Sequence, residues 1–311
     1  MALDHVNVYV IDEGDSWTII DTGFWSKKTQ SIWSDIKEKW FSDKPIGKVI
    51  VTHHHPDHVG LAGWFQTEFK AELWMSRTAW LMARMLRLDY QKLPTEETIN
   101  FWRSAGMDEL ILNERATGKP FNFGDSVHEM PLGFRRIIDG EKIILGNRSW
   151  IVRVGNGHAP EHLTLWCEDE PIVIAGDQII SSISPNLGVY ATEPEADPVQ
   201  EWLMSCEAFL PFSNDKQLVL PGHKLPFYGL PHRLKQLIEN HHSALKRLVA
   251  FLKEPQTAVD CFPVLFNRKI SDNEYGLALV EAVAHLNHLY RKKIVKRELN
   301  SKGAYVYTLK N

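Results

Sequence analysis

Cysteine is scarce in this chain of 311 residues, and its three cysteines form no recognisable pair. Cys167, Cys206 and Cys261 lie far apart, and no two of them show the C-x-x-C spacing of many zinc and redox motifs. An odd number of isolated thiols argues against a disulfide framework and against cysteine ligation of a metal. We therefore expect a protein of a reducing compartment, the cytoplasm.

Long apolar runs and an excess of positive charge are also missing. No apolar run approaches the roughly 20 residues that a helix needs to cross a bilayer, so we expect no membrane span. The formal net charge is −4, so only a local basic patch could attract nucleic acid. These absences favour a small-molecule substrate as partner over a membrane or a nucleic acid, and they leave a homodimer open.

What the chain does contain is a dense cluster of histidines. The apolar run 48–52 is followed directly by the pattern H-x-H-x-D-H, with His53, His55, Asp57 and His58 as its members. A strand that ends in imidazoles and a carboxylate can direct them toward metal ions. This all-N/O donor set suits zinc, with iron or manganese as alternatives. A purification tag would not stand between a strand and the start of a helix, so we interpret the segment as a metal site.

Single ligand-type residues recur at three more strand ends downstream. His158 follows the strand-like run 150–154, and Asp177 follows the run 171–174. His223 follows a third such run, 217–220. The six residues of one loop cannot close a site for two metals, so this recurrence is what a two-metal site requires.

The order of these motifs resembles the metallo-β-lactamase superfamily, and within it the glyoxalase II-like hydrolases. The resemblance covers residues 3–230. It implies two divalent metal ions, each held by three side chains, with one aspartate bridging them. At the matching positions of this chain the ligands are His53, His55 and His158 for the first metal, Asp57, His58 and His223 for the second, and Asp177 as the bridge.

The resemblance also implies roles for residues next to the ligands. Asp57 is expected to be catalytic, because it can both ligate a metal and pass a proton to the leaving group. Asp21, in an early turn, and His162, four residues after His158, are expected to lie behind the ligands and orient them. An ordinary Asx turn is the alternative for Asp21, and direct ligation is the alternative for His162. His54 is expected to be exposed or hydrogen-bonded locally.

From about residue 73 to 132 the chain becomes helical and rich in tryptophan, methionine and arginine, as in an insertion between sheet elements. Ser76 is expected to cap a helix that runs to about Leu88. Within this helix we expect Trp80 to cover an apolar part of the substrate and Arg84 to meet an anionic part. Simple packing and a solvated basic face are the alternatives. Two further residues, Tyr190 and Tyr228, are expected to orient the substrate, or else to be ordinary core or rim aromatics.

Residues 231–311 are expected to form a small second domain after a catalytic domain of residues 1–230. Helical patterns at 231–252, 257–266 and 271–289 precede a hairpin at 294–309, an order typical of a winged-helix-like unit. Ser271 and Glu274 have the spacing of a capping box for the third helix. The basic run 291–297 is expected to be a solvated face rather than a nucleic-acid contact.

The expected fold class is α+β, an αββα four-layer metallo-β-lactamase sandwich with the helical insertion and the C-terminal unit. Its first strand is expected to begin at Leu3, and residues 134–138 are expected in the second sheet. The expected activity is hydrolysis of a small thioester or lactone, in which a metal-bound hydroxide attacks the carbonyl. The alternatives are an endoribonuclease or phosphodiesterase that uses the same metals, and a mononuclear iron enzyme that oxidises persulfides.

Overall fold

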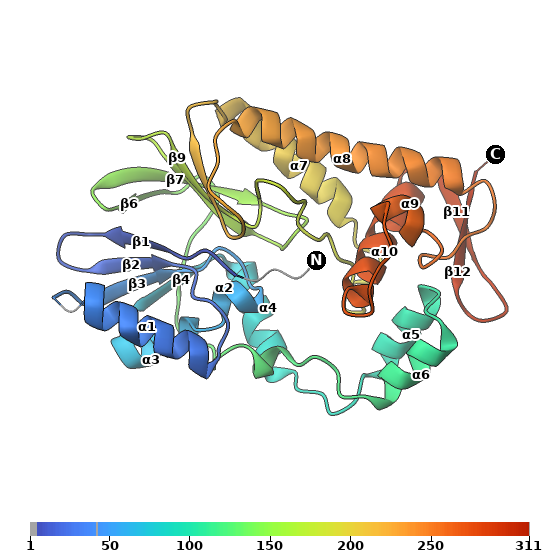
Figure 1. Cartoon of the computed structure of the whole chain (residues 1–311), viewed down its shortest axis with the longest axis horizontal. Helices are drawn as coiled ribbons and strands as arrows, with labels where there is room; N and C mark the ends of the chain where they lie inside the picture. Colours follow the sequence, from blue (N-terminus) through green and yellow to red (C-terminus); the bar gives the residue numbers. More distant parts are fainter. Residues whose placement is uncertain (1–4, 42, 311) are drawn as a thin grey trace.

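The computed structural model describes residues 5–41 and 43–310, and its main body consists of two facing five-stranded sheets (Figure 1). The first sheet contains β1 (Tyr9–Asp12), β2 (Trp17–Ile20), β3 (Ile46–Ile50), β4 (Glu72–Met75) and β5 (Arg135–Arg136), in this order. The second sheet contains, from one edge to the other, β10 (Leu218–Pro221), β9 (Ile172–Gly176), β8 (His162–Cys167), β7 (Arg148–Gly155) and β6 (Lys142–Leu145).

The direction of the strands brings several loops to one end of the sandwich. Strands β2 to β5 run parallel, so the loops that follow β2 and β3 leave the first sheet at the same edge. In the second sheet β9 and β10 are also parallel, and the turn between β7 and β8 adjoins the carboxyl end of β9. Every ligand motif singled out in the sequence lies on one of these loops.

Apolar side chains fill the space between the two sheets. The first sheet contributes Ile20 and Ile50, and the second contributes Val152, Leu163 and Leu165, all of them buried. Two facing layers of branched aliphatic side chains remove much apolar surface from water, which is the main force that holds the sheets together.

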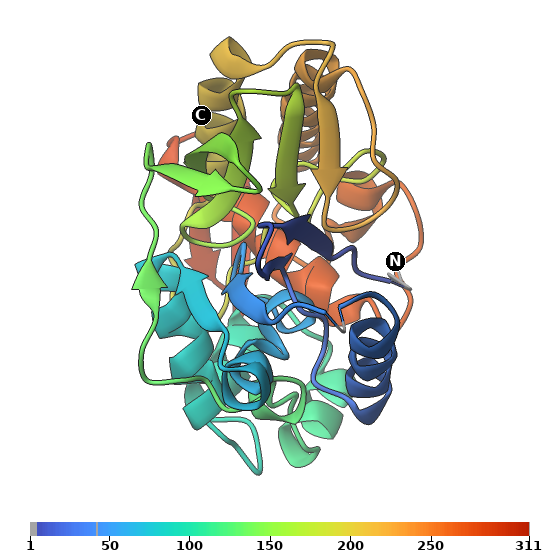
Figure 2. The ribbon, with the colours of Figure 1, turned by 90° about the vertical axis from the view of Figure 1, so that its left-hand side faces the viewer.

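Helices cover the outer face of each sheet, which gives the expected four layers (Figures 1 and 2). The first sheet is covered by α1 (Lys27–Trp40), α3 (Ala62–Phe69) and α4 (Arg77–Leu88). The second is covered by α7 (Pro198–Phe209) and α8 (Leu230–Phe251). The Ser76 side chain accepts from the Ala79 amide and caps α4, as the sequence predicts. Short helical turns connect these elements at α2 (Pro56–Val59), η1 (Phe123–Asp125) and η2 (Leu210–Phe212).

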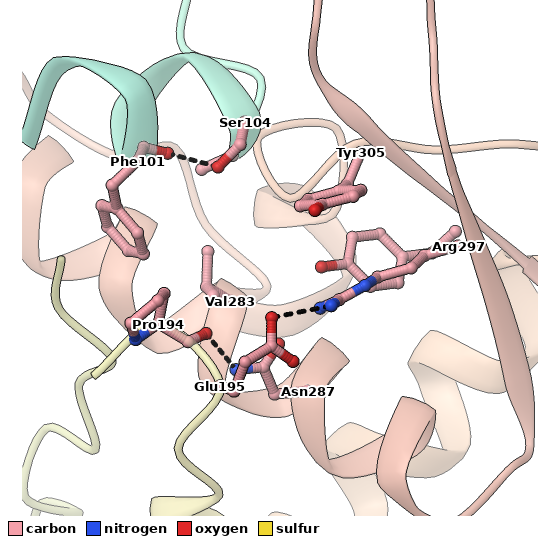
Figure 3. Close-up of a pocket in the computed structure, with 10 residues that line it drawn as sticks. Phe101, Ser104, Pro194, Glu195, Val283, Asn287, Arg297 and Tyr305 are labelled. Atoms are coloured by element: carbon pink, nitrogen blue, oxygen red, sulfur yellow. Dashed lines mark hydrogen bonds and ion pairs between the residues drawn. The ribbon is translucent and has the colours of Figure 1, made fainter. Parts of the chain in front are cut away.

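The C-terminal segment forms three helices and a hairpin in the expected order. After α8 come α9 (Phe262–Phe266), α10 (Tyr275–Arg291), β11 (Val295–Leu299) and β12 (Tyr305–Leu309). The inserted helices α5 (Glu96–Ser104) and α6 (Glu109–Thr117) pack in the same hydrophobic cluster as α7 to α10. Where α5 meets the hairpin, Phe101, Asn287 and Arg297 line a cavity of about 30 Å³ (Figure 3). The inserted segment is therefore split between two parts of the molecule: α4 packs on the sandwich, and α5 and α6 pack with the C-terminal helices.

Two expectations about the strands are wrong. Among the described residues the first strand begins at Tyr9, and residues 5–8 lie outside it because Asn7 bonds through its amide and side chain to the segment 221–224; Leu3 lies outside the described residues. The segment 134–138 adds β5 to the first sheet and not to the second, because Arg135 pairs with Trp74 of β4 and lies 3.8 Å from its ring centre.

Two expectations about the C-terminal helices also need correction. The second helix begins at Phe262 and not at residue 257, because Asp260 turns back to bond the amide and hydroxyl of Thr257. Helix α10 has Glu274 as its N-cap, and the Ser271 hydroxyl bonds the Glu274 carboxylate rather than a helical amide. In the part of the chain that the structure covers, no helix combines the length and apolarity needed to cross a membrane.

Candidate metal centre

The residues expected as metal ligands lie together at the loop end of the sandwich. His53, His55, Asp57 and His58 follow β3, and His158 lies in the turn between β7 and β8. Asp177 follows β9 and His223 follows β10. Residues from four separate loops, up to 170 positions apart along the chain, thus form one cluster.

Three imidazoles form the first group, in which His55 is central. Its Nδ1 lies 3.0 Å from His53 Nε2 and 3.0 Å from His158 Nε2. Neutral imidazole carries a single N–H, so three ring nitrogens this close cannot all be satisfied by hydrogen bonds to one another. They can be satisfied by one shared metal ion.

The second group joins two imidazoles to two carboxylates. His223 Nε2 lies 3.1 Å from Asp57 Oδ2 and 3.3 Å from Asp177 Oδ2. His58 Nε2 lies 3.4 Å from the same Asp177 oxygen and 3.7 Å from Asp57 Oδ2. Asp177 Oδ2 is also 3.6 Å from His158 Nε2, so this oxygen lies between the two groups.

The outer ring nitrogens of four histidines are held by oxygen atoms. His158 Nδ1 donates to the Asn186 carbonyl at 2.9 Å, and His223 Nδ1 donates to the backbone carbonyl of residue 5 at 2.6 Å. His58 Nδ1 lies 2.8 Å from the Asp21 carboxylate, and His53 Nδ1 lies 3.0 Å from the Thr52 hydroxyl. Each of these bonds places the proton on the outer nitrogen and turns Nε2 toward the centre of the cluster.

Asp21 organises the loop that carries the motif. Its two carboxylate oxygens accept from the Thr52 amide and hydroxyl, both at 2.8 Å, in addition to His58. Its backbone has φ of 61°, a left-handed conformation that is uncommon for residues other than glycine. The surroundings therefore hold Asp21 in a strained conformation that keeps its carboxylate beneath His58.

His162 lies beside the cluster. Its ring stacks on that of His53, with centres 4.5 Å apart, and its Nε2 accepts from the Asp177 amide at 3.1 Å. This contact occupies one ring nitrogen, and His162 belongs to none of the ligand triplets formed by the described residues, so it is placed to support His53 and Asp177 from behind.

The charged groups at the centre strongly shift one another's pKa values. Burial lowers the pKa of His58, but the carboxylates of Asp177, Asp57 and Asp21 outweigh it and hold the pKa well above the usual value. Burial likewise opposes charge on Asp177, but its neighbouring imidazoles keep the pKa of its carboxyl well below the usual range. The carboxylates thus attract positive charge to this place, either as protons on histidine or as metal ions, so metal binding should release protons.

The atoms that face the centre fit a metal better than they fit each other. His58 Nε2, His223 Nε2 and Asp177 Oδ1 are buried and make no hydrogen bond within the part of the chain that the structure describes. The two nitrogens lie 3.1–3.4 Å from carboxylate oxygens without forming a hydrogen bond to them, and a divalent cation would satisfy all three atoms. Three triplets of ligand atoms lie within 4.8 Å of one another, namely His53–His55–His158, His53–His58–Asp177 and Asp57–His58–His223.

Gly222 is required by the close packing of this centre. A side chain at this position would collide with the Asp177 carboxylate and the His58 ring. The order glycine-histidine after β10 therefore allows the chain to pass close behind the cluster and present His223.

The other predicted residues have different positions. His54 is buried and not exposed, because the loop turns its ring inward, and burial lowers its pKa to about 4. Trp80 and Arg84 bond to backbone carbonyls of the segment 130–131, and the Arg84 guanidinium lies 5.5 Å from the Trp80 ring centre. Tyr190 and Tyr228 are 50% and 66% exposed. Packing against the 130–134 segment thus accounts for Trp80 and Arg84 as they stand.

Sequence reasoning missed two residues that support the site. Asn186 holds His158, as described above, and Glu161 accepts from the Thr78 amide at the start of α4. The turn-forming pair Pro185-Asn186 gives a weak local signal, but the contact partner of each residue lies far away in the sequence.

Two family models match the chain. A model of the metallo-beta-lactamase superfamily matches residues 1–223, and a model described as metallo-beta-lactamase-like, C-terminal domain, matches residues 245–310. The curated "Probable metallo-hydrolase YqjP" of Bacillus subtilis is 24% identical over 320 residues, which cover 99% of this chain and 95% of that protein.

Solved structures resemble the whole chain. A beta-lactamase domain protein from Burkholderia ambifaria is 30% identical with a TM-score of 0.90, over 100% of this chain and 90% of that one. A metallo-beta-lactamase family protein from Thermus thermophilus is 25% identical with a TM-score of 0.79, over 98% of this chain and 94% of that one. The similarity therefore includes the C-terminal helices and hairpin as well as the sandwich.

Proposed function

The chain belongs to the metallo-beta-lactamase superfamily and is a metal-dependent hydrolase with a His/Asp metal-binding cluster, and on this premise we propose that its substrate is a small thioester or lactone. We further propose that it uses two divalent metal ions, zinc in the first place. The ligands in this proposal are His53, His55 and His158 for one ion, Asp57, His58 and His223 for the other, and Asp177 between them.

One observation carries the proposal. The inner nitrogens of His53, His58, His158 and His223 face a common centre, while each outer nitrogen is held by an oxygen atom. Holding the inner nitrogens in this way costs free energy if nothing binds them, but it favours the binding of a metal ion. Imidazole and carboxylate together suit zinc, whereas the buried thiols Cys206 and Cys261 play no part in the cluster.

The proposed chemistry divides between the ions and the chain. Bound divalent ions would supply an activated water and a Lewis acid for the substrate carbonyl. Asp57 is 20% exposed at its side chain, and its Oδ2 lies 3.1 Å from His223 Nε2. A carboxylate at this place can accept a proton and pass it to the leaving thiol or alcohol. Asp21 and Asn186 keep the imidazoles of His58 and His158 in position.

The side of α4 next to the cluster supports an apolar substrate group. The Thr78 amide donates to Glu161 at 2.7 Å, and Glu161 lies in the turn that carries His158 and His162. On a helix, Leu81 and Met85 share the face of Thr78, at three and seven positions further on. Both are exposed, at 51% and 45%, so this face of α4 has apolar surface that a substrate group can cover, whereas Trp80 and Arg84 are already engaged.

The test is a substrate screen on protein that has been stripped of metal and reloaded separately with zinc, manganese or iron. The panel contains acyl thioesters, lactones, phosphodiesters and a β-lactam, and the matched control is His53→Ala, which removes a ligand. We expect thioester or lactone hydrolysis that requires added metal and is abolished in the control.

Other outcomes would favour the alternatives. A clear preference for phosphodiesters or the β-lactam would overturn the proposed substrate class. Activity that requires iron at one equivalent per chain and consumes oxygen with a persulfide would replace hydrolysis by oxidation. A metal content of one or less per chain after reloading would overturn the two-metal part of the proposal.

A further inference from the structure

The segment 186–189 is held by helix α10 of the C-terminal unit. The Asn186 side-chain amide donates to Glu281 Oε2 at 2.7 Å and to the Leu277 carbonyl at 3.2 Å. The Val189 amide donates to the Val280 carbonyl at 3.1 Å. Residues 181–197 contain no helix or strand, so the segment is held by these contacts with α10 together with the burial of Leu187 and Val189 and the bond from Arg233 to the Ile183 carbonyl.

The other end of Asn186 reaches the metal cluster. Its backbone carbonyl accepts the Nδ1 proton of His158 at 2.9 Å. Asn186 is therefore bonded to α10 through its side chain and to His158 through its main chain. A displacement of this residue would turn the imidazole and move His158 Nε2 away from His55 Nδ1, which now lies at 3.0 Å.

Glu281 is an unfavourable residue for this place on packing grounds alone. Glu281 is partly buried, and the residues next to it along α10, Val280, Ala282, Val283 and Ala284, are buried and apolar. Burial raises the pKa of the Glu281 carboxyl to about 7, against the opposing effects of Asn186 and Arg268. A leucine would fill the position without the free-energy cost of burying a carboxylate, so the carboxylate needs another reason.

We propose that Glu281 is a positioning residue for His158, which it orients through Asn186, so that the C-terminal helix α10 sets the metal affinity of the His53–His55–His158 group. The proposal rests on the proposed ligand role of His158. It assigns the C-terminal unit a function in the metal site that packing alone would not require.

The test compares Glu281→Leu, which removes the shorter of the two hydrogen bonds that the Asn186 side chain makes to α10, with Glu281→Gln, which retains an acceptor at this place. The first readout is the cobalt(II) affinity of metal-free protein, measured by competition with a chelator. We expect Glu281→Leu to weaken the affinity by about 10–100-fold, as loss of an outer partner of a metal ligand typically does. We expect Glu281→Gln to recover most of it. The matched control is Glu239→Leu, a glutamate of α8 whose 62% exposed side chain contacts only Ser243 and Lys246 of the same helix among the described residues.

The Tm of the metal-free proteins separates positioning from general damage. Because leucine removes a carboxylate that is partly buried at an otherwise apolar stretch of α10, Glu281→Leu should unfold at the wild-type temperature or above it, even as its affinity falls. A wild-type cobalt affinity in Glu281→Leu would overturn the proposal. A loss of affinity accompanied by a matching loss of Tm would also overturn it, since that is the result of a structural defect.

A second readout is independent of hydrolysis. In metal-free protein labelled with 15N at histidine, His158 should carry its proton on Nδ1, and this signal should shift in Glu281→Leu but not in Glu239→Leu. An unchanged His158 signal would overturn the proposal whatever the substrate is. If these readouts show that Glu281 orients His158 through Asn186 but no thioester or lactone is hydrolysed, the proposed function fails and the positioning role stands.

Discussion

The carboxylate of Asp21 lies 2.8 Å from Nδ1 of His58, although the two residues are 37 positions apart and belong to loops of different strands. The same carboxylate bonds the amide and hydroxyl of Thr52, the residue that precedes the histidine motif. Asp21 thus fixes the base of the loop and the orientation of one imidazole at the same time. The left-handed backbone of Asp21, with φ of 61°, is the local strain that accompanies this arrangement.

This relationship predicts that Asp21→Asn weakens metal binding. An amide in place of the carboxylate cannot accept from Thr52 and His58 with equal strength, so His58 loses part of its orientation. The expected loss is about 10–100-fold in zinc affinity, measured by chelator competition on metal-free protein. Asp12→Asn, an exposed aspartate paired with Lys44, is the control and should keep wild-type affinity. Equal affinities in both variants would show that Asp21 serves only the turn.

A second prediction concerns Asp57. Asp57→Ala should reduce kcat/KM on the preferred ester or thioester by roughly 10²–10⁴-fold, because it removes both a ligand and a proton carrier. The Tm of the metal-free protein should change little, since the Asp57 side chain lies at the opening of the cluster with 20% of its surface exposed. Turnover close to that of wild type would contradict the role given to Asp57.

A third prediction tests the apolar face of α4. For a series of straight-chain acyl thioesters, kcat/KM should rise up to roughly fourfold with each added carbon that becomes buried. This factor corresponds to about 0.8 kcal/mol of activation free energy per carbon. Leu81→Gln should flatten this dependence and leave the shortest substrate unaffected. Leu110→Gln, at an 81% exposed position of α6, is the control. Rates that do not depend on acyl length in wild type would show that this face does not contact the substrate.

A fourth prediction concerns the basic run 291–297. Arg297 pairs with Glu195 at 2.7 Å and lies within 4.5 Å of the ring centres of Tyr290 and Tyr305, and Arg291 donates to the Glu195 carbonyl (Figure 3 shows the Arg297 pair). These contacts engage the two arginines, and Lys296 pairs with Glu298 at 3.2 Å, so the exposed Lys292 and Lys293 are the charges of the run to test. We expect weak binding of single-stranded RNA that is the same in wild type and in a variant with Lys292 and Lys293 changed to glutamine.

Fluorescence anisotropy at several salt concentrations measures this binding. A tight complex whose affinity falls steeply with salt and drops in the lysine variant would instead support a nuclease.

A fifth prediction concerns acid stability. Burial lowers the pKa of His241 to about 3 and that of His285 to about 4, and their rings bond to each other at 3.2 Å. Both are therefore neutral in the fold but gain protons in the unfolded chain below about pH 6.5. Their contribution to stability is complete above about pH 6.5 and is lost as the pH falls toward about 4.

The variant His241→Gln removes one of these titrations. Glutamine keeps a donor for His285, so the slope of unfolding free energy against pH should decrease by up to about 1.4 kcal/mol per pH unit between about pH 6.5 and 4. Urea unfolding of metal-free wild type and variant measures it. Parallel curves for the two proteins would show that His241 does not titrate differently on folding.

The strand-end position of the candidate ligands follows from local sequence. Donor residue types directly after β-branched runs are legible at His53–His58, His158, Asp177 and His223, because a strand leaves its last side chains at the edge of a sheet. Parallel strands bring such edges together, which the structure shows for β2 to β5 and for β9 and β10. Helix boundaries with a clear cap, such as Ser76 for α4, are local in the same way.

Other features depended on contacts that no local pattern encodes. Residues 134–138 have the local pattern of a strand, but only their contacts with β4, in which Arg135 pairs with Trp74 and Arg136 with Met75, assign them to the first sheet. Only two residues of β5 pair with β4, and so short a strand has no alternation of apolar and polar residues that would show which face is buried. The capping box at Ser271 forms only in part: the Glu274 carboxylate accepts from the Ser271 amide at 3.5 Å, but the Ser271 hydroxyl bonds this carboxylate, which also pairs with Arg268, instead of a helical amide.

By itself, therefore, the sequence determined the family, the layered fold and the candidate ligands, since these depend on residue type and on spacing within single strands and turns. The tertiary structure decided which atoms around the cluster bond to those ligands and fix the orientation of their rings. The bond between Asp21 and His58 and the two bonds that connect Glu281 through Asn186 to His158 join residues 28 to 95 positions apart. Such pairs form only where packed surfaces happen to meet, because short-range propensity and periodicity carry no information about the partner across a fold.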